Sequence, residues 1–250
     1  MEPIYERSFA VTSADTDRHG RLKPSHILMM LQEVAGDHSA LLGTDRDSLM
    51  QKDLFWAVIR HRVQIDRLPR HGETIRIETW PIPATRSSFP RSVIAYDAEG
   101  KECFRAMSLW VLMDMDKRNM ILPGKSGVTV SGMLTGSELA VPGSMALQNA
   151  GQKTERTVRY TDLDVNGHMN NCRYLDWVAD TLPGSFHGAH AVSEFTVNYL
   201  SEAREGEALE LHYQLTDGPC LGVDALRSGE MSPGHARVFS ARVLFDNGVL

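Results

Sequence analysis

The feature that most constrains this chain is an internal repeat, because two copies of one sequence pattern must fold into two similar units. Both copies begin near a Glu-Arg pair, Glu6-Arg7 and Glu155-Arg156. Three pairs of segments then match in the same order: 17–22 with 164–169, 68–73 with 202–207, and 108–114 with 240–246. The shared order predicts that the 250 residues hold the same structural unit twice.

The segment between the copies is rich in Gly and Ser and shows no sustained hydrophobic period. Such a composition is typical of a linker. We therefore expect three parts, which are an N-terminal unit over residues 1–122, a linker over 123–153 and a C-terminal unit over 154–250.

Each copy shows one helical pattern followed by several strand patterns. In the first copy, a wide apolar face that opens at Pro24-Ser25 and closes at Gly43 predicts a long buried helix. Alternation of apolar and polar residues predicts strands near 57–65, 75–78, 92–97 and 103–114. The second copy repeats this with a helix near 170–181 and strands near 192–199, 207–215, 222–227 and 236–245.

One helix followed by an antiparallel run of strands predicts an α+β unit. An antiparallel sheet that wraps around one apolar central helix is the hotdog arrangement. Since the pattern occurs twice, the sequence predicts a tandem, or double, hotdog fold within one chain.

The polar turn in front of the second helix is the first candidate site. Residues 160–171 (YTDLDVNGHMNN) contain Asp164, Asn166 and His168 and are expected to run straight into the helix. The N–H groups of a helix N-terminus suit a developing oxyanion, and Asn166 and His168 would add side-chain donors. Asp164 would orient these groups or hold the turn. From spacing alone, an ordinary turn-and-cap role for Asp164 and Asn166 stays open.

Glu202 is the second candidate, because it follows an alternating apolar strand, where its surroundings can tune a general base. The alternative is a solvated glutamate in an acidic turn with Glu205 and Glu207. The repeat favours the catalytic interpretation, since only the second copy has a complete polar set. The first copy has His19, Arg21 and Leu68 where the second has Asn166, His168 and Glu202.

Other residue groups fit simpler roles. His187 and His190 lack a third ligand at useful spacing, so we expect no metal site. The three cysteines show no CxxC or metal-binding spacing, which argues against a disulfide scaffold and favours a reducing compartment. Cys172 is expected to pack on the helix.

The net charge of −6 argues against a general nucleic-acid binder or an anionic-membrane binder. No stretch has the pattern of a secretion signal or the length of a membrane span. We therefore expect a soluble cytoplasmic protein that has neither a nucleic acid nor a membrane as its partner.

Two segments, LDVNGHMNNCRYLDW (163–177) and the strand end at 199–202, resemble the acyl-acyl carrier protein thioesterases of plants and bacteria. The resemblance covers nearly the whole chain. It implies two tandem hotdog units and no cofactor. It also implies hydrolysis of the thioester between a fatty acyl chain and the phosphopantetheine arm of acyl carrier protein, which releases free fatty acid in fatty acid biosynthesis.

The same resemblance implies a catalytic network of Asp164, Asn166, His168 and Glu202. Plant members have a cysteine directly after the glutamate, whereas this chain has Ala203. The resemblance therefore implies attack by water that Glu202 and His168 activate, with no cysteine acyl-enzyme at this position. It leaves open which of the two is the base.

Acyl carrier protein is small and acidic, so a basic surface should dock it. Residues 1–125 hold 18 Lys and Arg against 17 Asp and Glu, whereas residues 126–250 hold 8 against 15. We therefore expect docking on the first half, with Arg18, Arg21, Lys23, Arg60, Arg62, Arg67 and Arg70 as candidates. Candidates for the acyl pocket are Ile27, Met30, Leu31, Val34, Trp56 and Val58, for which core packing is the alternative.

Three other functions remain open. The same turn and glutamate would serve a hotdog thioesterase acting on acyl-CoA. A non-catalytic acyl-thioester-binding module and a hotdog dehydratase or hydratase are the others. The sequence leaves open the acyl chain length and whether the chain forms a homodimer.

Overall fold

The computed structural model describes residues 3–146, 151–228 and 237–246. The chain divides into two units, one made of residues 1–22 and 29–142 and the other of residues 23–28 and 143–250. Ala236, expected in the last strand, and residues 147–150 of the expected linker lie outside the described residues. Within the described part of the chain, no helix is both long and apolar enough to span a membrane.

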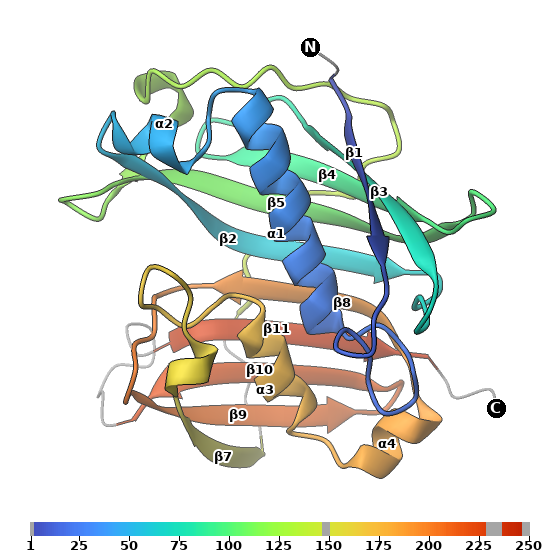
Figure 1. The fold of residues 1–250 in the computed structure, drawn as a ribbon. Helices are drawn as coiled ribbons and strands as arrows, with labels where there is room; N and C mark the ends of the chain where they lie inside the picture. The colour runs from blue at the N-terminus through green and yellow to red at the C-terminus, as the bar shows by residue number, and fades with distance from the viewer. Residues whose placement is uncertain (1–2, 147–150, 229–236, 247–250) are drawn as a thin grey trace. The chain divides into compact units, whose positions relative to one another are not determined.

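The first unit is an antiparallel sheet, and the part of helix α1 after Leu28 lies across its strands (Figure 1). The strand order is β1-β3-β4-β5-β2, and β6 pairs with β5. The strands are β1 (Tyr5–Ala10), β2 (Leu54–Ile65), β3 (Thr74–Pro81), β4 (Phe89–Tyr96), β5 (Glu102–Asp114) and β6 (Met120–Ile121). The helices are α1 (Pro24–Leu41), α2 (Arg46–Met50) and the 3-10 turn η1 (Pro123–Lys125).

The second unit repeats this plan with the strand order β7-β9-β10-β11-β8, again antiparallel. Its short helix α3 packs against β11 (Figure 1). The strands are β7 (Gln152–Thr157), β8 (Val192–Tyr199), β9 (Ala208–Thr216), β10 (Cys220–Arg227) and β11 (Arg237–Phe245). The helices are η2 (Tyr160–Asp162), α3 (Arg173–Ala179) and α4 (Gly184–Ala189). The two equal strand orders confirm the predicted tandem hotdog arrangement.

The apolar spacing of the sequence explains α1. Ile27, Leu31, Val34 and His38 recur every three or four residues and are at most 1% exposed, so they form one buried helix face. The helix ends at Leu41, and Gly43 follows with a φ of +66°, a conformation that favours glycine. The long helix predicted between Pro24 and Gly43 is confirmed.

Strand β2 differs from its predicted alternation because it contains a bulge. Val58 pairs with Trp110 and Arg60 pairs with Leu109, so Ile59 is the extra residue. The bulge places Trp56 and Val58 on the sheet face of His61 and Val63, since their partners on β5 alternate without interruption. Arg60 and Arg62 lie on the opposite face.

The edge strands β1 and β7 were not predicted. They carry charged residues on short segments, YERSFA and QKTERT. Among the strands of the described residues, β1 is hydrogen-bonded to β3 alone and β7 to β9 alone. Because edge strands bury little apolar surface, their hydrophobic period is weak. Both contain the Glu-Arg pair at which each copy of the repeat begins.

Much of the expected linker packs on the first unit. The backbone N–H of Met133 donates to Pro81 O at 3.0 Å, and a guanidinium N–H of Arg105 donates to Ser137 O at 3.0 Å. Gly132 lies so close to the backbone of Ile82 that a Cβ atom would clash with it. A side chain at position 132 would therefore force this segment away from β3.

Candidate functional site

The turn at 164–168 is built around the carboxylate of Asp164. Asp164 Oδ1 accepts hydrogen bonds from the backbone N–H of Asn166 at 2.8 Å and of His168 at 3.3 Å. The backbone N–H of Asp164 donates to His168 O at 2.8 Å and closes the turn. Gly167 has a φ of +74°, which favours glycine at this position. The turn therefore gives Asp164 a structural role.

Two hydrogen bonds join this turn to the end of β8. Met169 donates its backbone N–H to Ala203 O at 2.8 Å, and the phenolic O–H of Tyr199 donates to Asn171 O at 3.1 Å. These contacts bring His168 and Glu202 together, with 3.2 Å between His168 Nε2 and Glu202 Oε2. The His168 side chain is 17% exposed and that of Glu202 is 43% exposed. The pair therefore sits where solvent and a substrate reach the carboxylate.

Asn166 belongs to the same turn and is exposed. Its Nδ2 lies 3.4 Å from Asp164 Oδ2, so the Asp164 carboxylate orients the amide group. The structure thus brings all four residues of the predicted network into one site. A carboxylate and an imidazole can serve as general acid and base in the hydrolysis of a carbonyl compound, and an oriented amide can donate to the developing oxyanion.

The turn does not run directly into a helix as expected, because α3 begins only at Arg173. Several intervening backbone N–H groups already have acceptors. Those of Met169, Asn170 and Cys172 donate to Ala203 O, Asp162 O and Asn170 Oδ1. These three amides are therefore not oxyanion donors, whereas the side chain of Asn166 is exposed and carries an amide donor.

The first copy builds the same turn. Asp17 Oδ1 accepts from the backbone N–H of His19 at 2.8 Å and of Arg21 at 3.0 Å, and Gly20 has a φ of +71°. Leu22 donates its backbone N–H to Pro69 O at 2.8 Å, as Met169 does to Ala203 O. The predicted alignment of the two copies therefore holds at the level of individual hydrogen bonds.

The first copy lacks the acid-base pair. Arg21, at the position of His168, turns back to its own Asp17, with 3.0 Å from its guanidinium to Asp17 Oδ2. Leu68 stands at the position of Glu202 and has no polar group. The equivalent site of the first unit therefore cannot act as a general base through these positions.

The residues expected to bind the acyl chain are largely buried. Ile27 and Leu31 lie on the buried face of α1, and Val58 is 7% exposed. Trp56 is partly buried, stacks edge-on against Phe89 with ring centres 5.0 Å apart and donates its indole N–H to Thr44 O at 2.8 Å. Burial fits core packing and pocket lining equally well.

The arginines of β2 do not join these apolar residues, because they lie on the opposite face of the strand. Arg60 donates to Pro142 O at 3.1 Å and so holds the chain segment that follows the first unit's last strand. Arg62 shares its face. The members of the expected substrate-binding set that lie on β2 are thus divided between the two faces of that strand.

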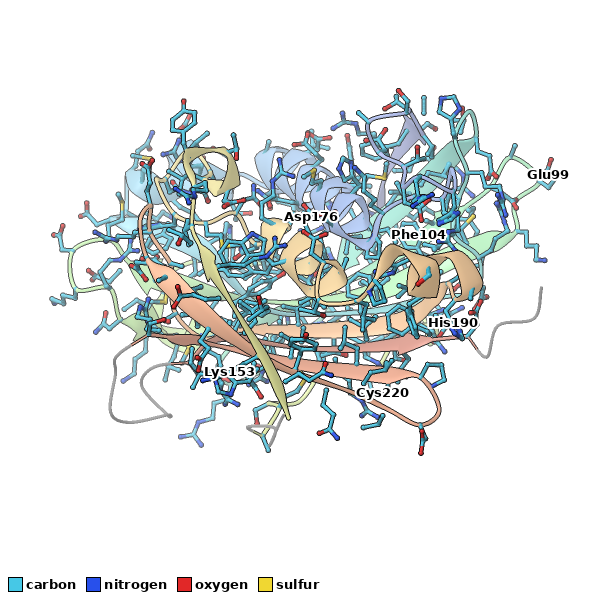
Figure 2. All side chains as sticks on the ribbon, turned by 90° about the horizontal axis from the view of Figure 1, so that it is seen from below. Glu99, Phe104, Lys153, Asp176, His190 and Cys220 are labelled. Carbon is cyan, nitrogen blue, oxygen red and sulfur yellow. The ribbon has the colours of Figure 1, made fainter. Side chains whose placement is uncertain are left out.

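The other candidate groups have structural partners. The ring nitrogen Nε2 of His187 lies 2.9 Å from Ala179 O, and Nδ1 of His190, labelled in Figure 2, lies 3.0 Å from Asp246 O. In the described ranges, no group of three or more metal-ligating side chains comes together. Cys172 is 1% exposed, and burial raises the pKa of its thiol to about 12.

Sequence reasoning missed Arg227, at the end of β10, which contacts the loop that carries Glu202. Asp97 occupies the corresponding place beside the first copy's loop but carries the opposite charge, so the repeat does not predict Arg227.

The two halves of the chain match two family models. The model described as the acyl-ACP thioesterase N-terminal domain matches residues 2–122, and that of the C-terminal domain matches residues 145–240. The chain is similar over 98% of its length to an acyl-ACP thioesterase structure from Bacteroides thetaiotaomicron, with a TM-score of 0.86 and 22% identity. A 12:0-ACP thioesterase structure from Umbellularia californica has a TM-score of 0.82 and 24% identity, and each comparison covers 98% of both chains. These likenesses show the fold.

Curated relatives carry related names. A dodecanoyl-[acyl-carrier-protein] hydrolase from Umbellularia californica is 27% identical over 82% of this chain and 58% of its own length. A palmitoyl-acyl carrier protein thioesterase from Gossypium hirsutum is 24% identical over 93% of this chain and 59% of its own length. This chain thus spans less than two thirds of the length of these relatives.

Proposed function

Because the chain belongs to the acyl-ACP thioesterase family, we propose that it hydrolyses acyl-acyl carrier protein and releases a free fatty acid. The observation that carries the proposal is the contact of His168 with Glu202 beside the oriented amide of Asn166. The role in fatty acid biosynthesis follows from the product.

In the proposed reaction, the Glu202–His168 pair takes a proton from water as the water oxygen forms a bond to the thioester carbonyl carbon. The amide of Asn166 donates to the carbonyl oxygen as negative charge develops there. The C–S bond then breaks, and the same pair returns the proton to the phosphopantetheine sulfur. The products are a fatty acid and the carrier's free thiol, so atoms and charge balance.

Substitution of each member of the pair tests the mechanism. Glu202→Gln and His168→Ala should each lower the release of fatty acid from acyl-ACP by about 10²–10⁴-fold, the usual contribution of general acid-base catalysis. Glu205→Gln is the matched control, because it removes an exposed glutamate three residues away and should retain turnover. Turnover near the wild-type value in either test variant would remove that residue from the mechanism.

A thioesterase that acts on acyl-CoA would use the same site, so turnover on acyl-ACP and acyl-CoA of equal chain length should be compared. A binding module would hold the acyl-thioester without releasing a product. The names of the relatives do not favour one acyl chain length, because the dodecanoyl, palmitoyl and oleoyl enzymes have nearly the same sequence identity to this chain, at 27%, 24% and 26%. A panel of acyl-ACPs with fatty acid detection measures the preference.

A further inference from the structure

Arg227 binds the loop of Glu202 at three points. Its Nε donates to Glu207 Oε2 at 2.9 Å and its Nη1 to Ser201 Oγ at 2.9 Å. Its Nη2 donates to the backbone carbonyl of Glu202. One planar guanidinium thus ties the first two residues and the last residue of the 201–207 loop to the last residue of β10.

The first copy offers a natural comparison. Glu73 has the place of Glu207, and Arg67 binds it at 2.8 Å while also pairing with Asp97 at 3.2 Å. Arg67 further contacts Cys103 Sγ at 3.6 Å. Within the described part of the first unit, the guanidinium of Arg67 makes no hydrogen bond to the carbonyl of Leu68. Both copies therefore anchor the loop glutamate, but the second also holds the main chain of the residue at the catalytic position.

We propose that Arg227 is a positioning residue, which holds the main chain of Glu202 so that its carboxylate meets His168. The inference rests on the proposed function. Glu202 needs such support because its side chain is 43% exposed and follows a strand end rather than lying within it. A carboxylate that acts as a base must be held close to its productive geometry, and displacement by about 1 Å can cost 10²-fold in rate.

The geometry also explains why an arginine suits this place. The guanidinium binds the carbonyl of Glu202 and the carboxylate of Glu207, while the Glu202 side chain contacts His168. Lysine presents a single ammonium and cannot reproduce three bonds in one plane. Arg227→Lys should therefore preserve charge and fold but not the position of Glu202.

The test compares Arg227→Met and Arg227→Lys with Asp97→Asn, which changes the corresponding place in the first copy and weakens the ion pair with Arg67. Acyl-ACP turnover and the melting temperature are measured for each variant. Both Arg227 variants should lose about 10²-fold in kcat with KM changed less than threefold. Asp97→Asn should lower the melting temperature similarly while keeping kcat within threefold of wild type. An unchanged kcat in both Arg227 variants, or an equal loss in Asp97→Asn, would overturn the inference.

A second background separates this inference from the proposed function. When Glu202→Gln is already present, Arg227→Lys should cause little further loss, because no base remains to be positioned. A full additional loss in that background would show a general structural role and overturn the inference. If Glu202→Gln alone keeps wild-type turnover, Glu202 is not the base, and the inference about Arg227 is then overturned together with the proposed mechanism. If Arg227→Met does not fold, Glu207→Gln, which weakens the same anchor, should reproduce the loss of kcat.

Discussion

At the scale of single residues, comparison of Asp17 with Asp164 shows which role of this aspartate is structural. Burial alone would raise the pKa of Asp17, but hydrogen bonds from the backbone of Arg21 and His19, with the charge of Arg21, lower it. Asp164 accepts the corresponding two backbone hydrogen bonds. Because the same carboxylate builds the turn in a copy without an acid-base pair, its main role is structural. The proposed chemistry would then depend on the side chains of Asn166, His168 and Glu202.

The cysteines give a prediction at the same scale. Burial raises the pKa of Cys172 to about 12 and that of Cys103 to about 11, so few thiolates form near neutral pH. We expect Cys172→Ala to retain acyl-ACP hydrolysis within about threefold, because the Cys172 thiol is buried and stays protonated.

Alkylation of the folded protein checks this prediction. Iodoacetamide, followed by mass spectrometry of peptides, should label the partly exposed Cys220 at the start of β10 (Figure 2) before the two buried thiols. Inhibition by the reagent that disappears in Cys172→Ala would instead identify Cys172 as a reactive thiol.

At the scale of secondary structure, hydrophobic period located the central elements. Strand β8 has the predicted bounds, and α1 fills the predicted interval. Edge strands β1 and β7 were not predicted, because a strand that pairs on one side alone can consist largely of polar residues and then shows no apolar alternation. The bulge of β2 was not predicted either. The extra residue moves the side chains before it to the other face of the sheet, and composition gives no sign of that change.

The site shows the same division between local pattern and tertiary contact. The turn at 164–168 and Glu202 were predictable, because in a repeat each residue can be compared with its counterpart in the other copy. The contact of Arg227 with the loop was not, since it depends on β10 ending beside a loop about 25 residues earlier in the chain. The prediction that the turn runs straight into a helix was wrong, because α3 begins only at Arg173.

Buried His61, on strand β2 next to β5, predicts that stability depends on pH. His61 is buried between them, with its Nδ1 2.9 Å from Ser108 Oγ, and burial lowers its pKa to about 3. The unfolded histidine titrates near pH 6.5, so the unfolded chain binds an extra proton between about pH 3 and 6.5. The free energy of unfolding should therefore decrease as the pH falls below 6.5.

Urea unfolding at pH 7, 6 and 5 measures this dependence. His61→Gln keeps a polar partner for Ser108 but does not titrate, so it should reduce the slope by up to about 1.4 kcal/mol per pH unit. Buried His38, whose pKa is lowered to about 4 by burial and by nearby Arg91, should retain its own share of the slope. An unchanged slope in His61→Gln would show that His61 is not the titrating group.

At the scale of the whole molecule, three of the arginines expected to dock the carrier protein already have partners within the chain. Arg21 pairs with Asp17, Arg67 with Glu73 and Asp97, and Arg60 donates to Pro142 O. Two of the candidate docking residues, Arg18 and Arg70, are exposed. Their segments lie side by side, since Arg21 and Arg70 form a β-bridge and His71 donates to Gly20 O at 2.9 Å. The carrier protein should therefore dock on this edge of the first unit.

Charge reversal tests the docking edge. Arg18→Glu with Arg70→Glu should raise KM for acyl-ACP by about tenfold or more at low salt, because the acidic carrier would meet negative charge. The difference from wild type should shrink as salt screens the interaction, and turnover of any acyl-CoA substrate should be unchanged.

The matched control reverses the same number of charges at Lys52 and Lys117, which are exposed at the end of the β2–β5 pair opposite to the loop of Arg70. Lys52→Glu with Lys117→Glu should leave KM for acyl-ACP within about twofold of wild type, because a specific docking edge depends on where charge lies rather than on its sum. An equal rise in KM in both double variants would assign the effect to net charge. No rise in either would place the docking surface away from Arg18 and Arg70.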